Sequence, residues 1–155
     1  MPWTLRVTRL FYHWAYTLLR LYWFLVRPDV YGVKCVLCWN QHLLMIRHTY
    51  GRPAWTVPGG GIHKGETPEE AVRREVAEEV GITLRQVRYL GEIVSIHDYV
   101  RDHIAVFAAT TTSADITLDP FEILQAQWFP LDALPPLSDN ARQVLRVWQQ
   151  LYCIY

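Results

Sequence analysis

Residues 60–82, which read GGIHKGETPEEAVRREVAEEVGI, constrain the fold of this chain more than any other segment. Thr67 is a favoured N-cap residue, and Pro68 suits the first position of a helix. Glu70 completes a capping box with Thr67. Gly81 is a residue type at which helices commonly end in a left-handed conformation. The segment therefore predicts a helix between Thr67 and Gly81, and its core-facing side is expected to consist of apolar residues: Ala71, Val72, Val76 and Val80.

The polar side of this helix carries three glutamates, Glu75, Glu78 and Glu79, at spacings of three and four residues. Residues at these spacings share one helix face, where like charges repel by roughly 0.2–0.5 kcal/mol per pair. No lysine lies between the three glutamates. A hard divalent cation such as Mg²⁺ explains the crowding, because carboxylates and substrate phosphates are its usual ligands. The alternative, a solvated acidic face, is disfavoured by the agreement of these acids with Glu66, Arg74 and the preceding glycines.

The segment before the helix, Pro58-Gly59-Gly60-Gly61, is a loop that brings bare backbone close to a ligand. Together with the helix it resembles the Nudix hydrolase signature, G-x5-E-x7-R-E-U-x-E-E-x-G-U, in which U is a bulky aliphatic residue. Every fixed position of that signature is filled in this chain, by Gly60, Glu66, Arg74, Glu75, Val76, Glu78, Glu79, Gly81 and Ile82.

This resemblance implies an α/β fold, a Nudix-like α-β-α sandwich with a mixed β-sheet. It also implies a Mg²⁺-dependent hydrolase, with Mn²⁺ as a second possible metal. Such an enzyme cleaves the pyrophosphate bond of a nucleoside diphosphate linked to another moiety, such as a nucleotide or a nucleotide sugar. The alternative is a catalytically inactive Nudix-like module that binds or senses nucleotides. Such modules usually lack carboxylates of the signature, and none is missing here.

The resemblance also implies roles for individual residues. The expected metal ligands are the carboxylates of Glu75, Glu78 and Glu79 and the carbonyl of Gly59. Arg74 is implied to orient the neighbouring glutamate, and Glu66 to tie the loop to the helix.

The general base is left open by the sequence. Glu75 is the first candidate, and Glu78 is the second. Family members differ in where the base lies, and some take it from a later loop. Glu122 is the best-placed later acid, ahead of Asp98 and Asp102.

Two further residues are candidates for substrate binding. Arg47 lies shortly before the glycine loop, where a substrate phosphate can reach it, although a solvated hairpin end accounts for it equally well. Asp139 begins the last expected helix, where acids read the base in some relatives, and helix capping is the competing interpretation. The sequence does not identify the substrate, the phosphorus attacked or the number of metal ions.

The distribution of charge separates the first 28 residues from the remainder. The 155-residue chain has no net charge, but residues 1–28 contain four arginines and no acid, so the rest is acidic by four charges. An acidic body disfavours sequence-independent binding of long nucleic acid, which requires a basic surface. We expect an N-terminal segment over residues 1–31 and one catalytic domain over residues 32–155.

Residues 4–27 predict an amphipathic helix with a narrow basic stripe and a wide aromatic face. Three interpretations compete. The helix packs on the catalytic domain or on a second copy of the chain, or it lies in a membrane interface, or it is a signal or membrane-spanning segment. The last is the weakest, because Arg20 interrupts the apolar run. The expected location is therefore the cytoplasm, with peripheral membrane contact as an alternative.

Cys35 and Cys38 form a C-x-x-C pair within a predicted strand. An offset of three residues places two strand side chains on opposite faces of a sheet, so we expect structural residues and not a redox or zinc site. The remaining pattern predicts an alternating α/β arrangement. Strands are expected over residues 33–39, 43–48, 55–57, 87–96, 103–111 and 124–129, with a turn at 40–41, a loop at 113–120 and a helix over 139–152 capped by Ser138.

Overall fold

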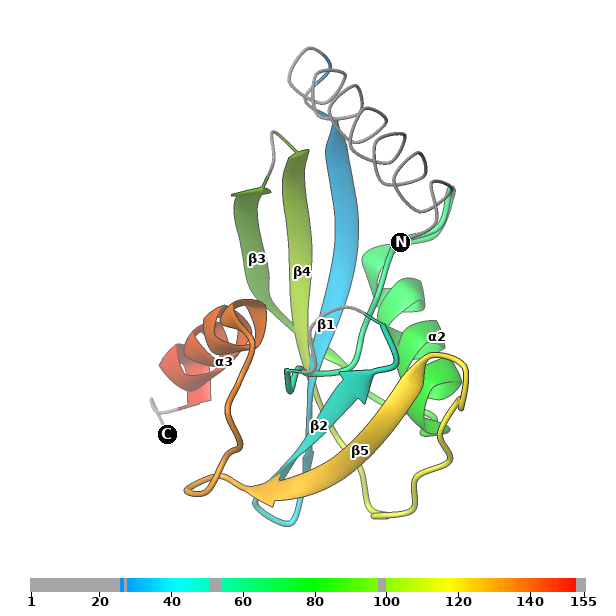
Figure 1. The fold of residues 1–155 in the computed structure, drawn as a ribbon, viewed down its shortest axis with the longest axis vertical. Helices are drawn as coiled ribbons and strands as arrows, with labels where there is room; N and C mark the ends of the chain where they lie inside the picture. The colour runs from blue at the N-terminus through cyan, green and yellow to red at the C-terminus, as the bar shows by residue number, and fades with distance from the viewer. Residues whose placement is uncertain (1–25, 27, 51–53, 98–99, 153–155) are drawn as a thin grey trace, which may run out of the picture. The chain divides into compact units, whose positions relative to one another are not determined.

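The computed structural model describes residues 26, 28–50, 54–97 and 100–152 (Figure 1). The amphipathic helix predicted over residues 4–27 lies outside this part of the chain except for Val26. The described chain forms five strands and two helices: β1 (Asp29–Trp39), β2 (His42–His48), α2 (Pro68–Val80), β3 (Arg88–His97), β4 (Val100–Thr110), β5 (Ile123–Pro130) and α3 (Asp139–Tyr152).

The strands form one mixed sheet in the order β3-β4-β1-β2-β5. Strand β2 is antiparallel to both β1 and β5. The amide of Arg101 donates to the carbonyl of Pro28, and the amide of Thr111 donates to that of Cys38, each at 3.0 Å. Both pairs advance in the same direction along the chain, so β4 runs parallel to β1. This mixed sheet with its two helices confirms the predicted α/β fold class.

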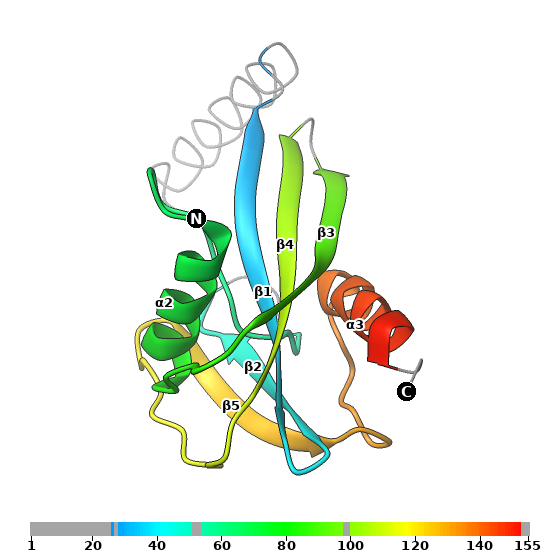
Figure 2. The same ribbon diagram turned by 180° about the vertical axis from the view of Figure 1, so that it is seen from behind.

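The two faces of the sheet are covered by different helices, as both views of the ribbon show (Figures 1 and 2). Alternating residues of β1 explain this arrangement, because successive side chains of a strand point to opposite faces. Cys35 packs in one buried cluster with Val72 and Val76 of α2. Val36 packs in a second cluster with Val144 of α3. The sheet is therefore the middle layer between two apolar cores.

The C-x-x-C pair follows the same alternation, as predicted. Cys35 belongs to the cluster beneath α2, and Cys38 packs against the cluster beneath α3. Both thiols are free. Burial raises the pKa of Cys38 to about 11 and that of Cys35 further still. These cysteines therefore fill the core and do not present reactive thiolates.

The strand predicted over residues 55–57 does not form. Thr56 makes an isolated bridge to Ile46, and Trp55 makes another to Leu137. Beyond this point the chain leaves β2 and runs beside β1, where the amide of Cys35 donates to the carbonyl of Pro58 at 2.9 Å. The backbone thus changes partners within three residues, which leaves no length for a regular strand.

Residues 26, 28–30, 94–97 and 100–103 are the described part of a separate compact unit. Within it the carboxylate of Asp29 lies 3.7 Å from the guanidinium of Arg101 and 3.5 Å from His103. Among the described residues, no helix has the length and apolar character needed to cross a membrane.

Candidate active site

The helix α2 begins and ends where the sequence predicts. The Thr67 hydroxyl accepts the Glu70 amide at 3.3 Å, and the Glu70 carboxylate accepts the Thr67 amide at 2.8 Å. Gly81 has a positive φ of 70°, and its amide donates to Ala77. This capped helix presents one charged face to the glycine loop. We call this surface, formed by Glu66, Arg74, Glu75, Glu78 and Glu79 beside the loop, the acid face.

Arg74 is the centre of the acid face. Its Nε and Nη2 donate to the two oxygens of Glu66 at 2.8 and 2.9 Å. Its Nη1 donates to Glu75 at 2.8 Å and to Glu78 at 3.0 Å, and Nη2 also donates to the carbonyl of Gly61 at 2.9 Å. One guanidinium thus joins three carboxylates to the loop backbone, with the bidentate geometry that makes such pairs strong.

Glu66 closes the loop against the helix. Besides its two bonds to Arg74, its carboxylate accepts the amide of His63 at 2.9 Å. The hydrogen bonds from Arg74, followed by that from His63, hold the pKa of Glu66 down at about 2. Glu66 is therefore ionised throughout the physiological range and keeps the turn between glycine loop and helix in place.

Glu79 is the most buried charged residue of the acid face, with only 2% of its surface exposed. Its carboxylate accepts the amide of Gly59 at 2.8 Å. Its pKa is raised to about 7, chiefly by burial and also by the charges of Glu75 and Glu122, whereas the charge of Lys34 and the Gly59 hydrogen bond oppose the rise. The carboxylates of Glu75 and Glu122 are thus close enough to act on that of Glu79.

The glycine loop fits against these carboxylates because it lacks side chains. Gly59 has a φ of 131°, and a Cβ there would lie 2.2 Å from the carbonyl oxygen of Val33. A Cβ on Gly60 would lie 2.5 Å from a carboxylate oxygen of Glu75. The loop therefore requires glycine at position 59, where a Cβ would meet backbone, whereas a Cβ at position 60 would displace the carboxylate of Glu75.

Lys34 was not among the residues expected at the site. Its Nζ donates to the carbonyl of Gly59 at 2.6 Å and to that of Val57 at 3.2 Å. The sequence gives one signal for this role, which is a charged lysine between two apolar strand residues. Those neighbours, Val33 and Cys35, are buried in the structure.

A second group of side chains joins the site from the end of β2. Thr49 donates its amide to the carbonyl of Glu122 at 2.9 Å and its hydroxyl to that of Phe121 at 2.7 Å, which brings the later loop to the acid face. The ring of His48 stacks on that of Tyr50 at 5.0 Å, and its Nδ1 lies 3.9 Å from Glu79.

The electrostatic environment of these rings agrees with that position. Burial lowers the pKa of His48, and the charge of Lys34 adds to this effect. Burial raises the pKa of Tyr50, and the charges of Glu122, Glu79 and Glu75 raise it further. Tyr50 therefore lies within the field of the glutamates, and His48 lies within that of Lys34.

The other predicted site residues lie differently. The guanidinium of Arg47 lies 5.5 Å from the ring centroid of Trp55, and its Nη1 is 3.5 Å from Gln125. Asp139 bonds to Arg142 in the first turn of its own helix, which is capped by the Ser138 hydroxyl accepting the amide of Ala141 at 3.1 Å. Asp102 belongs to the separate compact unit, and Asp98 lies outside the described residues.

The residue types of the acid face suit a hard divalent cation, although the ligands are not arranged as a ready cage. Within the described parts of the chain, no three acidic, histidine or cysteine side chains are grouped so as to hold a metal ion. Arg74 holds Glu75 and Glu78, and Lys34 holds the Gly59 carbonyl. Glu79, a buried acid with a raised pKa beside two other carboxylates, is the feature that fits a metal.

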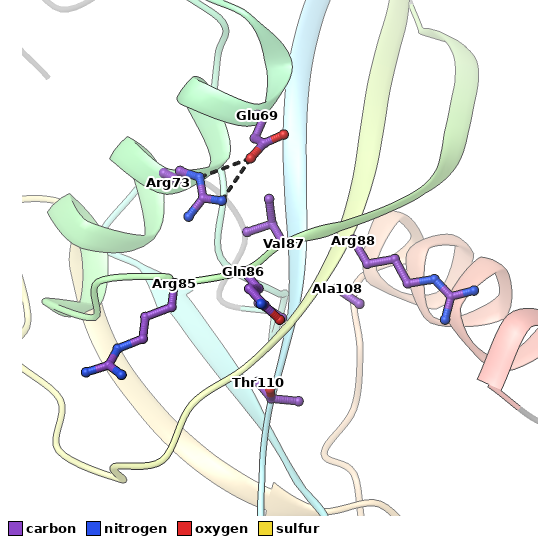
Figure 3. A pocket seen from close by; sticks show the side chains of 9 residues that line it. Glu69, Arg73, Arg85, Gln86, Val87, Arg88, Ala108 and Thr110 are labelled. Atoms are coloured by element: carbon purple, nitrogen blue, oxygen red, sulfur yellow. Dashed lines mark hydrogen bonds and ion pairs between the residues drawn. The ribbon is translucent and has the colours of Figure 1, made fainter.

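The opposite side of α2 has a different character. A cavity of about 450 Å³ lies between α2, the start of β3 and the end of β4. Figure 3 shows side chains that line it. Arg73 donates to Glu69 through Nε and Nη2 at 3.3 and 2.8 Å, and it also bonds to the carbonyl of Leu84. We call this surface the basic face; its charged residues are Glu69, Arg73, Arg85 and Arg88.

Comparison with known proteins gives concordant matches. A family model described as the NUDIX domain matches residues 28–148. The NAD-capped RNA hydrolase NudC of Shigella flexneri is 40% identical over 110 residues, covering 68% of this chain and 42% of that protein. The NudC of Haemophilus influenzae is 39% identical over 101 residues, covering 63% of this chain and 38% of that protein. The chain thus spans about two fifths of the length of these curated relatives.

Solved structures agree. The crystal structure of a MutT NUDIX hydrolase from Burkholderia pseudomallei superposes with a TM-score of 0.71 at 27% identity. The match covers 77% of this chain and 97% of that one.

Proposed function

The chain belongs to the Nudix hydrolase family, and from that premise we propose that it is a divalent-metal-dependent hydrolase of the pyrophosphate bond in a nucleoside diphosphate derivative. The observation that carries the proposal is the complete acid face, in which Arg74 binds three glutamates while a fourth, Glu79, lies buried beside the glycine loop.

The donor set suggests which residues would hold Mg²⁺ or Mn²⁺. These are the carboxylates of Glu75, Glu78 and Glu79, with the carbonyl of Gly59 as a further oxygen. A divalent metal, when bound, would neutralise the charge of the pyrophosphate and lower the pKa of a bound water molecule. Arg74 then acts as a positioning residue, because its bonds to Glu75 and Glu78 orient two of these carboxylates.

We propose Glu122 as the general base, with Glu75 as the alternative. Glu75 is bound to Arg74, and so is the half-exposed Glu78. The Glu122 carboxylate has no hydrogen bond or ion pair within the described residues, yet its charge acts on Glu79 and Tyr50. A carboxylate that is near the acids but is not held by a guanidinium is free to accept a proton from water.

The substrate class that we propose is a nucleoside diphosphate joined to a second group. Tyr50, which is 62% exposed and stacked on His48, offers an aromatic surface beside the acids. Arg47 is a candidate phosphate contact, and Asp139 is a weaker candidate contact to the base. Because the NudC relatives are hydrolases of NAD-capped RNA, the expectation that long nucleic acid is not a substrate needs a direct test.

The proposal is tested by assaying the full chain with Mg²⁺ on nucleoside triphosphates, dinucleoside polyphosphates, nucleotide sugars and NAD-capped RNA. We expect turnover of at least one class. Glu79→Gln and Glu122→Gln should each lower kcat by about 100-fold or more, the scale typical of acid–base groups. Glu69→Gln is the matched control, because it makes the same change on the basic face of the same helix and should leave kcat within about twofold. Ligand binding without any turnover would instead support the inactive binding module.

The N-terminal segment remains a prediction. We propose that residues 4–27 cover an apolar surface of the same chain or of a second copy, with membrane contact as the alternative. Flotation with anionic liposomes, comparing the full chain with one that starts at Tyr31, distinguishes them. Flotation of only the full chain would establish membrane contact, and equal behaviour of the two would favour packing.

A further inference from the structure

Both backbone polar groups of Gly59 are hydrogen-bonded to charged side chains. Its amide donates to Glu79 at 2.8 Å, and its carbonyl accepts from Lys34 at 2.6 Å. The same ammonium takes the carbonyl of Val57 at 3.2 Å. Lys34 comes from β1 and the glycine loop follows β2, so this contact joins segments that are 23 to 25 residues apart in the chain. One lysine therefore fixes which way the Gly59 carbonyl points.

The ammonium of Lys34 is bound by oxygen atoms of the type that also coordinate a hard metal cation. Two backbone carbonyl oxygens bind it, and the charge of Lys34 acts on the buried carboxylate of Glu79. Carbonyl and carboxylate oxygens are also the ligands of Mg²⁺. An ammonium and a divalent cation on the same carbonyl would repel each other strongly, because the site is largely removed from water.

We propose that Lys34 is a positioning residue that holds the Gly59 carbonyl in the metal-free protein and releases it when a divalent cation binds. Lysine and cation are then alternatives at this oxygen, and Lys34 sets the metal affinity of the site. The inference rests on the metal dependence contained in the proposed function. In the metal-free protein, Lys34 would supply a positive charge beside Glu79, whose pKa the charges of Glu75 and Glu122 also raise.

The chain offers a matched control, because it contains only one other lysine, Lys64. Lys64 is exposed in the turn before α2. The experiment compares the unsubstituted chain with Lys34→Met, Lys34→Arg and Lys64→Met. Thermal unfolding is measured in EDTA and in saturating Mn²⁺, and the Kd for Mn²⁺ is measured from the electron paramagnetic resonance signal of the free ion. No substrate is present in either measurement.

Lys34→Met is expected to lower the Tm in EDTA by about 3–6 °C, through the loss of two hydrogen bonds from a charged donor. In saturating Mn²⁺ the difference should disappear, and the Kd for Mn²⁺ should tighten by about three- to tenfold. Lys34→Arg, which still donates to carbonyls, should restore the Tm in EDTA. Lys64→Met should match the unsubstituted chain in all three measurements.

Three results would overturn the inference. A Tm loss of equal size in EDTA and in Mn²⁺ would mean that the Lys34 bonds persist beside the metal. Tighter Mn²⁺ binding with no loss in EDTA would reduce the role of Lys34 to long-range repulsion. An unchanged Kd would exclude competition. A chain that neither binds Mn²⁺ nor hydrolyses any substrate would instead contradict the proposed function itself, whereas each of the three results above leaves that function intact.

Discussion

Arg73 and Arg74 are neighbours in the chain, but they belong to different faces of α2, because a helix turns by about 100° per residue. Arg74 reaches three carboxylates and the carbonyl of Gly61, and 21% of its side chain is exposed. Arg73 reaches one carboxylate, that of the half-exposed Glu69, and one carbonyl. The acid face has four glutamates and one arginine, whereas the basic face has three arginines and one glutamate.

The difference between the two faces lies in the segments that complete them. The acid face is closed by the loop before α2, whose glycines let backbone and carboxylates meet. The basic face is completed by the segment after α2, which offers Arg73 a carbonyl and adds two arginines whose side chains point apart (Figure 3). The charged residues of α2 and of the segments next to it thus form two different surfaces. The acid face is tightly hydrogen-bonded, whereas the basic face lines a polar cavity.

The largest effect is expected from breaking the loop that closes the acid face. Gly59→Ala places a Cβ 2.2 Å from the Val33 carbonyl at a φ of 131°. We expect a loss of at least about 3 kcal/mol in the free energy of unfolding. Gly61→Ala is the control, because a Cβ there meets nothing within 4 Å. Urea denaturation of both variants measures the difference, and equal stability would show that the loop does not pass through this gap.

The next effect concerns pH. Glu79 has a pKa of about 7 in the folded protein against 4.5 for its ordinary value, so folding favours its protonated form. Its contribution to stability is therefore fully present below pH 4.5 and is lost as the pH rises to 7. This amounts to at most roughly 3 kcal/mol.

The unfolding free energy of metal-free protein, measured in urea with EDTA between pH 5 and pH 8, should therefore fall with rising pH. Glu79→Gln should flatten this dependence, whereas Glu69→Gln on the basic face should not. A slope unchanged by Glu79→Gln would assign the titration to another group.

The smallest effect is the direct comparison of the two arginines. Arg74→Met leaves partly buried carboxylates without their cation and should destabilise the chain by about 2 kcal/mol. Arg73→Met removes an exposed pair and one carbonyl bond and should cost about 1 kcal/mol. Thermal and urea unfolding of both variants in the same buffer measure which substitution lowers the free energy of unfolding more. If Arg73→Met proved the more damaging, the acid face would not be the better-bonded side of the helix.

Local patterns were sufficient for much of the fold. The cap at Thr67, the end at Gly81 and the spacing of Val72 and Val76 predict α2, because capping and helical periodicity act within a few residues. The alternation of β1 likewise predicts that Cys35 and Cys38 lie on opposite faces. The strand expected over residues 55–57 fails because Thr56 pairs with β2 and Pro58 with β1, a change of partner that no local pattern encodes.

The sequence by itself determined the helix α2, the glutamates gathered on one of its sides and the glycines beside it, because each depends on residues close together in the chain. Only the tertiary structure decided that Glu79 is buried while Glu78 stays half-exposed. It also decided that Glu122 lies near the acids and that Lys34 donates a hydrogen bond to the carbonyl of Gly59. Those outcomes depend on which distant segments pack together across the sheet, because that packing determines how buried each side chain is and which charges lie near it.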